Sequence, residues 1–202
     1  MACENLAPQI LSRIMGEIRE LVRNPPDGIE YCNDQEDSTL SEIHAIITGP
    51  EETPFFGGKF RMKLVLSEDY PNSPPRGFFL TKIFHPNVAT NGDIYVNTLK
   101  KDWNSQVTIK HVLQVIRCLL IVPFPESSLN DEAGKMFMDS YEEFAARARI
   151  MTEVHAIPVG SLKLGVDTMS NETEGQGISS SSKENSKKSK EKDLKKKSMK
   201  RL

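Results

Sequence analysis

A regular alternation of apolar and charged side chains constrains the fold of this chain more than any other feature. Phe60, Met62 and Leu64 alternate with Arg61 and Lys63. Successive side chains of a β-strand point to opposite faces, so this period of two predicts a strand with one buried face. A single strand is not stable alone. The remaining sequence must therefore supply partner strands and a layer that covers the buried face.

Partner strands are predicted close by in the chain. Short apolar runs at residues 29–33, 41–48 and 77–80 have strand character. The pair Gly57-Gly58 is predicted to form a hairpin turn before the alternating run. Four successive short strands that are separated by turn residues favour an antiparallel meander.

Helices are predicted before and after the strands along the chain. Apolar residues recur at helical spacing over residues 8–22, 108–120, 130–138 and 140–154, and Thr108 is the predicted N-cap of the second helix. The sequence therefore predicts an α+β domain with an N-terminal helix, a four-stranded antiparallel meander, a long irregular loop and C-terminal helices.

Charge is distributed unevenly along the chain. The net charge of the 202 residues is −2, yet residues 183–202 contain ten Lys or Arg against three Asp or Glu. These residues carry +7, so by difference the other 182 residues carry −9. Gly, Ser, Thr and Asn dominate the stretch before the basic residues, which is typical of linkers. We predict a core domain over 7–155, a flexible linker over 156–182 and a Lys-rich tail over 183–202.

Cysteine usage points to a reducing compartment. Cys3, Cys32 and Cys118 are widely spaced and odd in number, so neither a disulfide framework nor a metal site is expected. Cys118 falls in a helical pattern and is predicted to be a small buried core residue. The N-terminus lacks the pattern of a signal peptide, and no apolar run approaches the ~20 residues that span a bilayer. We expect a soluble protein of the cytoplasm and nucleus, without a membrane partner.

The irregular loop, residues 83–102, is rich in Asn, Gly and Pro, and long loops inside a compact domain are usually functional. Three motifs follow one another in and just after it: His85-Pro86-Asn87, Gly92-Asp93-Ile94-Tyr95 and Trp103. They resemble the active-site segment of ubiquitin-conjugating enzymes, which runs His-Pro-Asn, then Gly-x-Ile-Cys, then a downstream Trp. The preceding Pro71-x-x-Pro74-Pro75 resembles the proline-rich turn of the same family.

Further stretches resemble the S-type branch of this family: Phe79–His85, Pro125-Glu126-Ser127, Tyr141–Arg149 and the basic C-terminal end. The resemblance covers roughly residues 10–154. It implies the ubiquitin-conjugating fold, with ubiquitin, the ubiquitin-activating enzyme and the anaphase-promoting complex as partners. It implies no bound cofactor, since ATP is used by the upstream activating enzyme.

The basic tail has a partner-binding role in the S-type branch. By resemblance, the residues expected to dock here are Lys195, Lys196, Lys197, Lys200, Arg201 and Leu202. The same residues are compatible with a nuclear localisation signal or with a solvated segment that docks nowhere. Nucleic-acid binding is the weakest of these interpretations, because the tail has no aromatic side chain that could stack on bases.

Tyr95 stands where the family motif has the cysteine that forms a thioester with ubiquitin. A thiol has a pKa near ~8.5, whereas a phenol has a pKa near ~10 and is only about 0.1% ionised at pH 7. The resemblance with this departure predicts an inactive module that binds ubiquitin or a ligase. An active transferase that extends chains with the anaphase-promoting complex is the alternative, and a variant copy with little function of its own is a third hypothesis.

Other residues of the motif are predicted to have structural roles. By resemblance, Asn87 stabilises an oxyanion or holds the active-site loop, and we favour the second role because the cysteine is missing. His85 is expected to fix the loop and Trp103 to be a packing anchor. Glu126 and Asp131 are expected at the solvated surface rather than beside an acceptor amine.

Overall fold

The computed structural model describes residues 7–32 and 41–160. Its elements follow the chain in this order: α1 (Pro8–Arg23), β1 (Ile29–Cys32), β2 (Glu42–Thr48), β3 (Gly58–Val65), β4 (Arg76–Phe79), the 3-10 helix η1 (Asn97–Leu99), α2 (Ile109–Leu119), the 3-10 helix η2 (Pro125–Ser127), α3 (Asp131–Asp139), α4 (Tyr141–His155) and β5 (Ile157–Pro158). This order confirms the predicted α+β class. Among the described residues, no helix is both long and apolar enough to cross a membrane.

The strands β1 to β4 pair in chain order as an antiparallel sheet, which confirms the predicted meander. The alternating run is β3, and its partners in β2 place apolar residues opposite apolar residues, as in the pairs Ile47↔Phe60 and Ala45↔Met62. All four of these side chains are buried. The predicted period of two therefore sets the buried face of the sheet.

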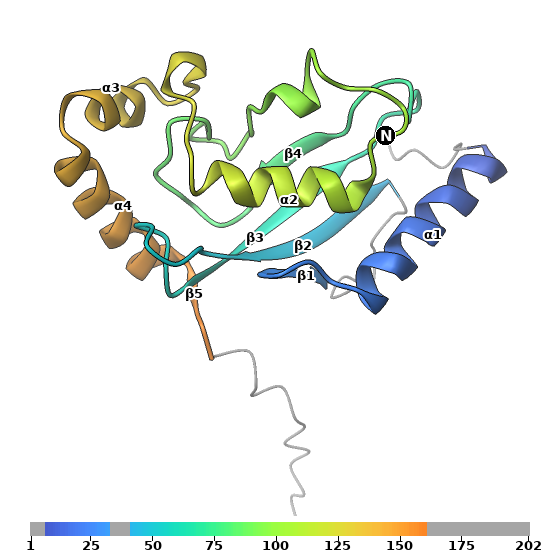
Figure 1. The fold of residues 1–202 in the computed structure, drawn as a ribbon, viewed down its shortest axis with the longest axis horizontal. Helices are drawn as coiled ribbons and strands as arrows, with labels where there is room; N and C mark the ends of the chain where they lie inside the picture. The colour runs from blue at the N-terminus through green and yellow to red at the C-terminus, as the bar shows by residue number, and fades with distance from the viewer. Residues whose placement is uncertain (1–6, 33–40, 161–202) are drawn as a thin grey trace, which may run out of the picture. The chain divides into compact units, whose positions relative to one another are not determined.

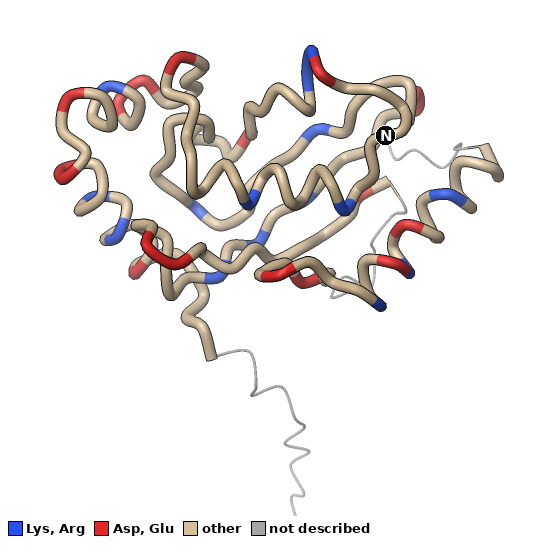
Figure 2. The backbone as a smooth tube through the Cα atoms, in the orientation of Figure 1, with Lys and Arg blue, Asp and Glu red and all other residues tan. Residues whose placement is uncertain are grey.

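Charged residues on the other face pair across strands. Lys59 on β3 lies 2.7 Å from Glu30 on β1, and Lys63 lies 2.9 Å from Glu42 on β2. Figure 2 shows blue and red positions along the strands of the sheet. The sheet thus has one apolar and one ion-paired face, as an antiparallel sheet with one solvated face does.

Helix α2 covers the apolar face, with α1 near β1 and α3 and α4 toward the other end of the sheet (Figure 1). The apolar stripe of α2 is buried: Ile109, Val112, Leu113, Ile116 and Leu119. From α1, Ile14 and Leu21 are buried. Thr108 caps α2 as predicted, because its side chain accepts a hydrogen bond from the backbone N–H of His111.

The prediction that Cys118 is buried is wrong, because its side chain is exposed. Its neighbours Arg117 and Leu119 are part-buried and buried, so the helical stripe passes close to it. Position 118 instead continues the exposed line of His111 and Gln114, which recurs at helical spacing on the opposite side of α2.

Two predictions about the ends of β3 and the domain need correction. Gly57-Gly58 is not a two-residue hairpin turn: residues 49–57 join β2 to β3, and Gly58 is already the first residue of β3. This connection folds back close to Gly49, where an added Cβ would lie 1.8 Å from the carbonyl oxygen of Phe55. Residues 157–158, expected in the linker, form β5 and pair with the start of β3.

Candidate functional site

The irregular loop after β4 folds back on the sheet edge before it reaches Tyr95. Isolated bridges join Phe78 to Asp93 and Val88 to Ile94. Gly92 has a φ of 90°, and an added Cβ would lie 2.2 Å from the carbonyl oxygen of Phe79. Only glycine fits this close turn. The turn therefore fixes the direction in which the chain enters Tyr95.

His85 is fully buried beneath this loop. Its Nε2 is 3.0 Å from the carbonyl oxygen of Leu119, and its Nδ1 is 3.0 Å from the backbone nitrogen of Asn87. These partners require a neutral ring in which Nε2 donates and Nδ1 accepts. Burial lowers the pKa of His85 to about 4, although the hydrogen bond to Leu119 opposes this shift. A buried ring with both nitrogens occupied holds the loop and cannot reach a substrate.

Asn87 is also fully buried and joins two segments of the site. Its Nδ2 donates to the carbonyl oxygens of Phe124 at 2.7 Å and Ser127 at 3.1 Å, and its Oδ1 accepts from the backbone N–H of Phe124 at 2.8 Å. Its backbone oxygen accepts from the N–H of Tyr95 at 2.9 Å. Both amide protons are occupied, so donation to an oxyanion would require one of these bonds to break.

Pro86 connects the same loop to the segment that leads into α3. Its carbonyl oxygen accepts hydrogen bonds from the backbone N–H groups of Leu129 at 2.8 Å and Asn130 at 3.0 Å. The hydroxyl oxygen of Ser128 lies 3.0 Å from the same carbonyl oxygen. Asn87 and Pro86 together therefore anchor residues 124–130 against the active-site loop.

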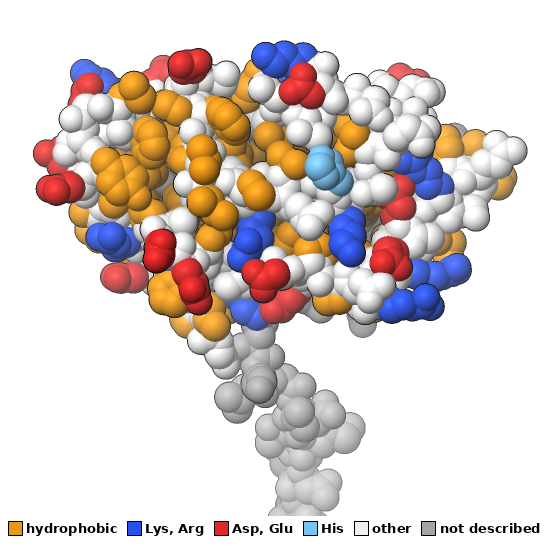
Figure 3. Space-filling view, in the orientation of Figure 1, with side chains coloured by type: hydrophobic (Ala, Val, Ile, Leu, Met, Phe, Trp, Pro, Cys, Tyr) orange, Lys and Arg blue, Asp and Glu red, His pale blue; other side chains and the backbone are white. Residues whose placement is uncertain are grey.

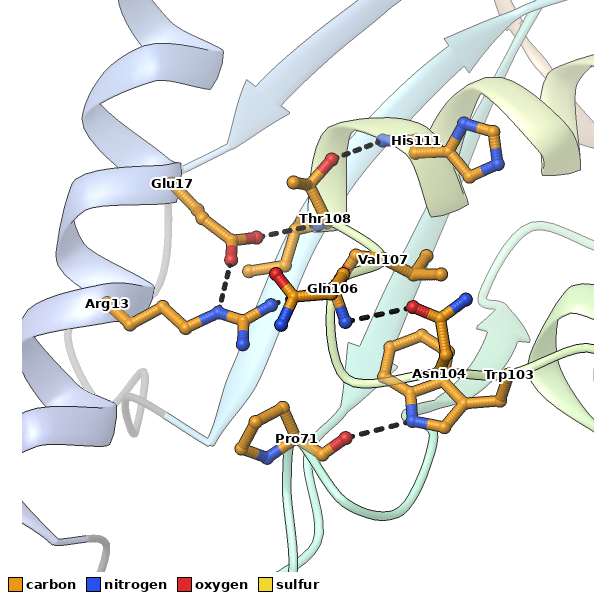
Figure 4. A network of polar contacts seen from close by, with 10 residues as sticks. Arg13, Glu17, Pro71, Trp103, Asn104, Gln106, Val107, Thr108 and His111 are labelled. Atoms are coloured by element: carbon orange, nitrogen blue, oxygen red, sulfur yellow. Dashed lines mark hydrogen bonds and ion pairs between the residues drawn. The ribbon is translucent and has the colours of Figure 1, made fainter.

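Trp103 is half-buried at the end of the loop, where its Nε1 donates to the carbonyl oxygen of Pro71 at 2.9 Å (Figure 4). Its ring packs against Tyr70, with 6.1 Å between the ring centroids. Tyr70 is fully buried, and burial together with the nearby Glu17 carboxylate raises its pKa to about 12. This geometry agrees with a packing anchor at Trp103.

Tyr95 is half-buried and forms part of the wall of a hollow of about 340 Å³. The residues that line this hollow come from two stretches and from α3: Tyr95, Asn97, Lys101, Phe124, Pro125, Glu126, Ser127 and Met138. We call it the Tyr95 hollow. The Tyr95 side chain has no hydrogen bond to the residues that the structure describes, and neither Cys32 nor Cys118 lines the hollow.

The structure brings some predicted site residues together and separates others. Glu126 is exposed and lines the Tyr95 hollow, whereas Asp131 is exposed and does not line it. Lys101, Phe124 and Met138 were not predicted, because only the fold brings them beside Tyr95. The six tail residues from Lys195 to Leu202 lie outside the described residues, as does Cys3.

A larger hollow of about 450 Å³ lies on the other side of the loop, between residues 79–92 and the residues Glu132 and Arg147. Gly92 lines it, but His85, Asn87, Tyr95 and Trp103 do not. Arg147 is ion-paired with Glu132, and its guanidinium lies 4.5 Å from the centroid of the Phe84 ring. Within the described ranges, no group of three or more His, Cys, Asp or Glu could hold a metal ion. The Tyr95 hollow is therefore the candidate site.

Comparison with known proteins identifies the family. Residues 13–152 match the family described as ubiquitin-conjugating enzyme. Ubiquitin-conjugating enzyme E2 22 of Arabidopsis thaliana is 54% identical over 162 residues, which are 80% of this chain and 64% of that protein. The chain thus spans less than two thirds of the Arabidopsis relative.

Two relatives are similar over more of their length. Ubiquitin-conjugating enzyme E2 S of Xenopus tropicalis is 54% identical over 153 residues, which are 76% of this chain and 72% of the relative. Ubiquitin-conjugating enzyme E2 S of Drosophila persimilis is 52% identical over 176 residues, which are 87% of this chain and 82% of the relative. With its α+β fold and its His-Pro-Asn loop, the chain belongs to the ubiquitin-conjugating enzyme family.

Proposed function

We propose that Tyr95 occupies the place of the thioester cysteine and that the chain acts as a ubiquitin- or ligase-binding module without carrying ubiquitin itself. The observation that carries this proposal is the phenol in the wall of the hollow, where the family chemistry needs a thiol. A phenol needs a base to become a nucleophile at neutral pH. The Tyr95 hydroxyl has no such partner among residues 7–32 and 41–160.

The rest of the site is intact, which favours a binding role over a site that has lost all function. The Tyr95 side chain takes no part in the contacts that hold the loop, which run through its backbone N–H and through Asn87 and Pro86. A residue change at position 95 therefore leaves these contacts in place. A third hypothesis, a relic with little function, would not require a loop anchored by so many buried hydrogen bonds.

Ubiquitin and the activating enzyme follow from the family, whereas the anaphase-promoting complex rests on the resemblance to the S-type branch. We propose ubiquitin, the ubiquitin-activating enzyme and the anaphase-promoting complex as partners, with the basic C-terminal residues as the contact to that complex. The chain itself would use no cofactor, and it would work in the cytoplasm and nucleus. Residues 183–202 carry a net charge of +7, so we expect binding through the tail to weaken as salt concentration rises.

A charging assay tests the proposal. With activating enzyme, ATP and ubiquitin, and without reductant, the wild-type chain should form no thiol-sensitive adduct, whereas Tyr95→Cys should form one. Cys118 has an exposed thiol that can form an adduct of its own. The wild-type chain and Tyr95→Cys are therefore each tested with and without Cys118→Ser. A wild-type adduct that survives in Cys118→Ser but disappears in Tyr95→Phe would establish the active alternative.

The same assay separates a binding module from a degraded site. If Tyr95→Cys binds the activating enzyme but forms no ubiquitin adduct, the site has lost more than its nucleophile. That result would count against the binding-module hypothesis. For the tail, removal of residues 183–202 should reduce capture by the anaphase-promoting complex. Equal capture of the shortened chain would assign no docking role to these residues.

A further inference from the structure

One stretch of surface combines exposed apolar side chains with a strong excess of acidic over basic residues. It runs from the end of α2 through α3 to the start of α4, and we call it the α3 surface. Its exposed large apolar residues are Ile121, Val122, Phe124, Leu129, Met138 and Tyr141. Figure 3 shows orange side chains gathered over this part of the molecule. Val122 and Met138 are 61% and 67% exposed, and such a concentration of exposed apolar residues is typical of an interaction site.

The charge of this surface is almost entirely negative. Residues 121–143 contain six Asp or Glu and a single Lys, a net charge of −5. Among the described residues, only Glu132 of these acids has an ion pair, with Arg147. Glu126, Asp131, Asp139 and Glu142 are exposed and have no cationic partner there. The acidic positions lie along α3 and the start of α4 in Figure 2.

We propose that the α3 surface binds a basic amphipathic segment of a partner protein, with apolar side chains that contact Val122, Phe124 and Met138 and Lys or Arg side chains that face the acids. Charge complementarity selects this partner, because an acidic rim around an apolar centre repels acidic segments and attracts basic ones. Phe124 and Met138 also line the Tyr95 hollow, so the α3 surface adjoins that site. The proposal goes beyond the binding module described above, and it requires no covalent step at Tyr95.

The test uses the full chain and a fluorescent helical peptide of Leu and Lys in amphipathic order. The peptide should bind, and its affinity should fall as salt rises. Val122→Ser combined with Met138→Ser should weaken binding at least about fivefold, as expected for two central apolar contacts. Asp139→Asn combined with Glu142→Gln should reduce the salt dependence. The matched control is Ile150→Ser with Val154→Ser, which removes equally exposed apolar side chains from α4 and should leave affinity unchanged.

Several outcomes would overturn the proposal. Equal binding by the α3-surface variant and the α4 control would show that any exposed apolar side chain suffices. Equal binding of a peptide with Glu in place of Lys would remove the role of charge. Stronger binding after removal of residues 161–202 would identify the chain's own C-terminal segment as the occupant, and a dimer abolished by Met138→Ser would identify a second copy. Peptide binding is measured on the uncharged chain, so its result is separate from that of the charging assay: failure to bind the peptide overturns the α3 surface alone, and a wild-type adduct overturns the proposed function alone.

Discussion

At the scale of single residues, His85 can keep both of its buried hydrogen bonds only while its ring is neutral. Burial lowers its pKa to about 4, whereas an unfolded chain has a histidine pKa near 6.5. Between these pH values the unfolded chain binds a proton that the folded chain does not bind. Stability is therefore highest above pH 6.5 and falls as pH decreases toward 4, by about 3 kcal/mol for this residue.

Two measurements check this pH dependence. In a nuclear magnetic resonance titration, the His85 ring should remain neutral until about pH 4, the pKa that burial imposes. Urea unfolding of His85→Gln should show less loss of stability between pH 7 and 4.5 than the wild type. His111→Gln changes an exposed ring and is the control. A His85 ring that becomes charged near pH 6.5 in the folded protein would contradict the prediction.

Glu52 is the only residue other than glycine with a positive φ, 59°, among the residues that the structure describes. A residue with a side chain is strained at this φ by roughly 1–2 kcal/mol. Glycine removes this strain, but it also makes the unfolded chain more flexible, which offsets part of the gain. Glu52→Gly should therefore raise the free energy of unfolding by about 0.5–1 kcal/mol. The control Glu51→Gly, which relieves no such strain, should lower it. Chemical denaturation measures both, and equal effects would contradict the prediction.

Single residues also show where prediction from sequence ends. The loop-fixing role predicted for His85 and Asn87 agrees with their complete burial, although the motif could not reveal that every polar atom of the Asn87 side chain is occupied. Cys118 was predicted to be buried because it falls in a helical pattern and free cysteines are usually buried, but a helix turns 100° per residue and places it on the exposed side. The positive φ of Glu52 had no signal in the sequence.

At the scale of elements, helical spacing located α1 and α2 to α4, alternation located β3, and short apolar runs located β1, β2 and β4, each within a few residues. β5 was not predicted, because two residues are too few to show a period and its partner strand lies a hundred residues earlier in the chain. The β2–β3 connection was predicted wrongly as a two-residue turn, because paired glycines also occur where a strand begins. Gly58 is needed there since an added Cβ would lie 2.7 Å from the Ala156 and Thr152 side chains.

Glu17 joins two of these helices. Its Oε1 accepts from Arg13 Nε at 2.8 Å within α1, and its Oε2 accepts from the backbone N–H of Ile109, the first residue of α2, at 2.7 Å (Figure 4). A carboxylate at a helix N-terminus is stabilised by the helix dipole. The side chain is 15% exposed, so Glu17→Gln should lower the free energy of unfolding by about 1–2 kcal/mol.

The control for Glu17 is Glu20→Gln on the same helix. Glu20 accepts a hydrogen bond from Asn24 at an exposed position, so its loss should cost less than about 0.5 kcal/mol. Hydrogen exchange adds a local measurement. Glu17→Gln should increase exchange of the first amides of α2, including Ile109, while Glu20→Gln should leave them unchanged. Equal exchange in the two variants would show that Glu17 does not hold α2.

At the scale of the whole molecule, the Tyr95 hollow is assembled from residues far apart in sequence. Tyr95, Phe124 and Met138 each lie in a different segment, and Asn87 and Pro86 hold these segments together. The motif identified one wall of the hollow, because its residues are contiguous and resemble a family. The other wall depends on how residues 124–130 fold back, which is a tertiary property without a local pattern.

The end of the folded core provides the last test at this scale. The sequence predicts that the core ends at residue 155, yet Ile157 and Pro158 pair with β3, and the N–H of Val159 donates to the carbonyl oxygen of Gly57 at 3.1 Å. A chain that ends at residue 160 keeps these contacts, whereas a chain that ends at residue 155 loses them. Each hydrogen bond contributes about 1 kcal/mol net.

We therefore expect the chain that ends at residue 155 to be less stable than the one that ends at residue 160, by about 1–3 kcal/mol. The full chain and the chain that ends at residue 160 should unfold with equal free energy, since the composition after that point predicts a linker and tail that bury little. Urea denaturation of the three chains measures both differences. Equal stability of the two shortened chains would remove β5 from the core, and a more stable full chain would mean that residues 161–202 contribute to the core's stability.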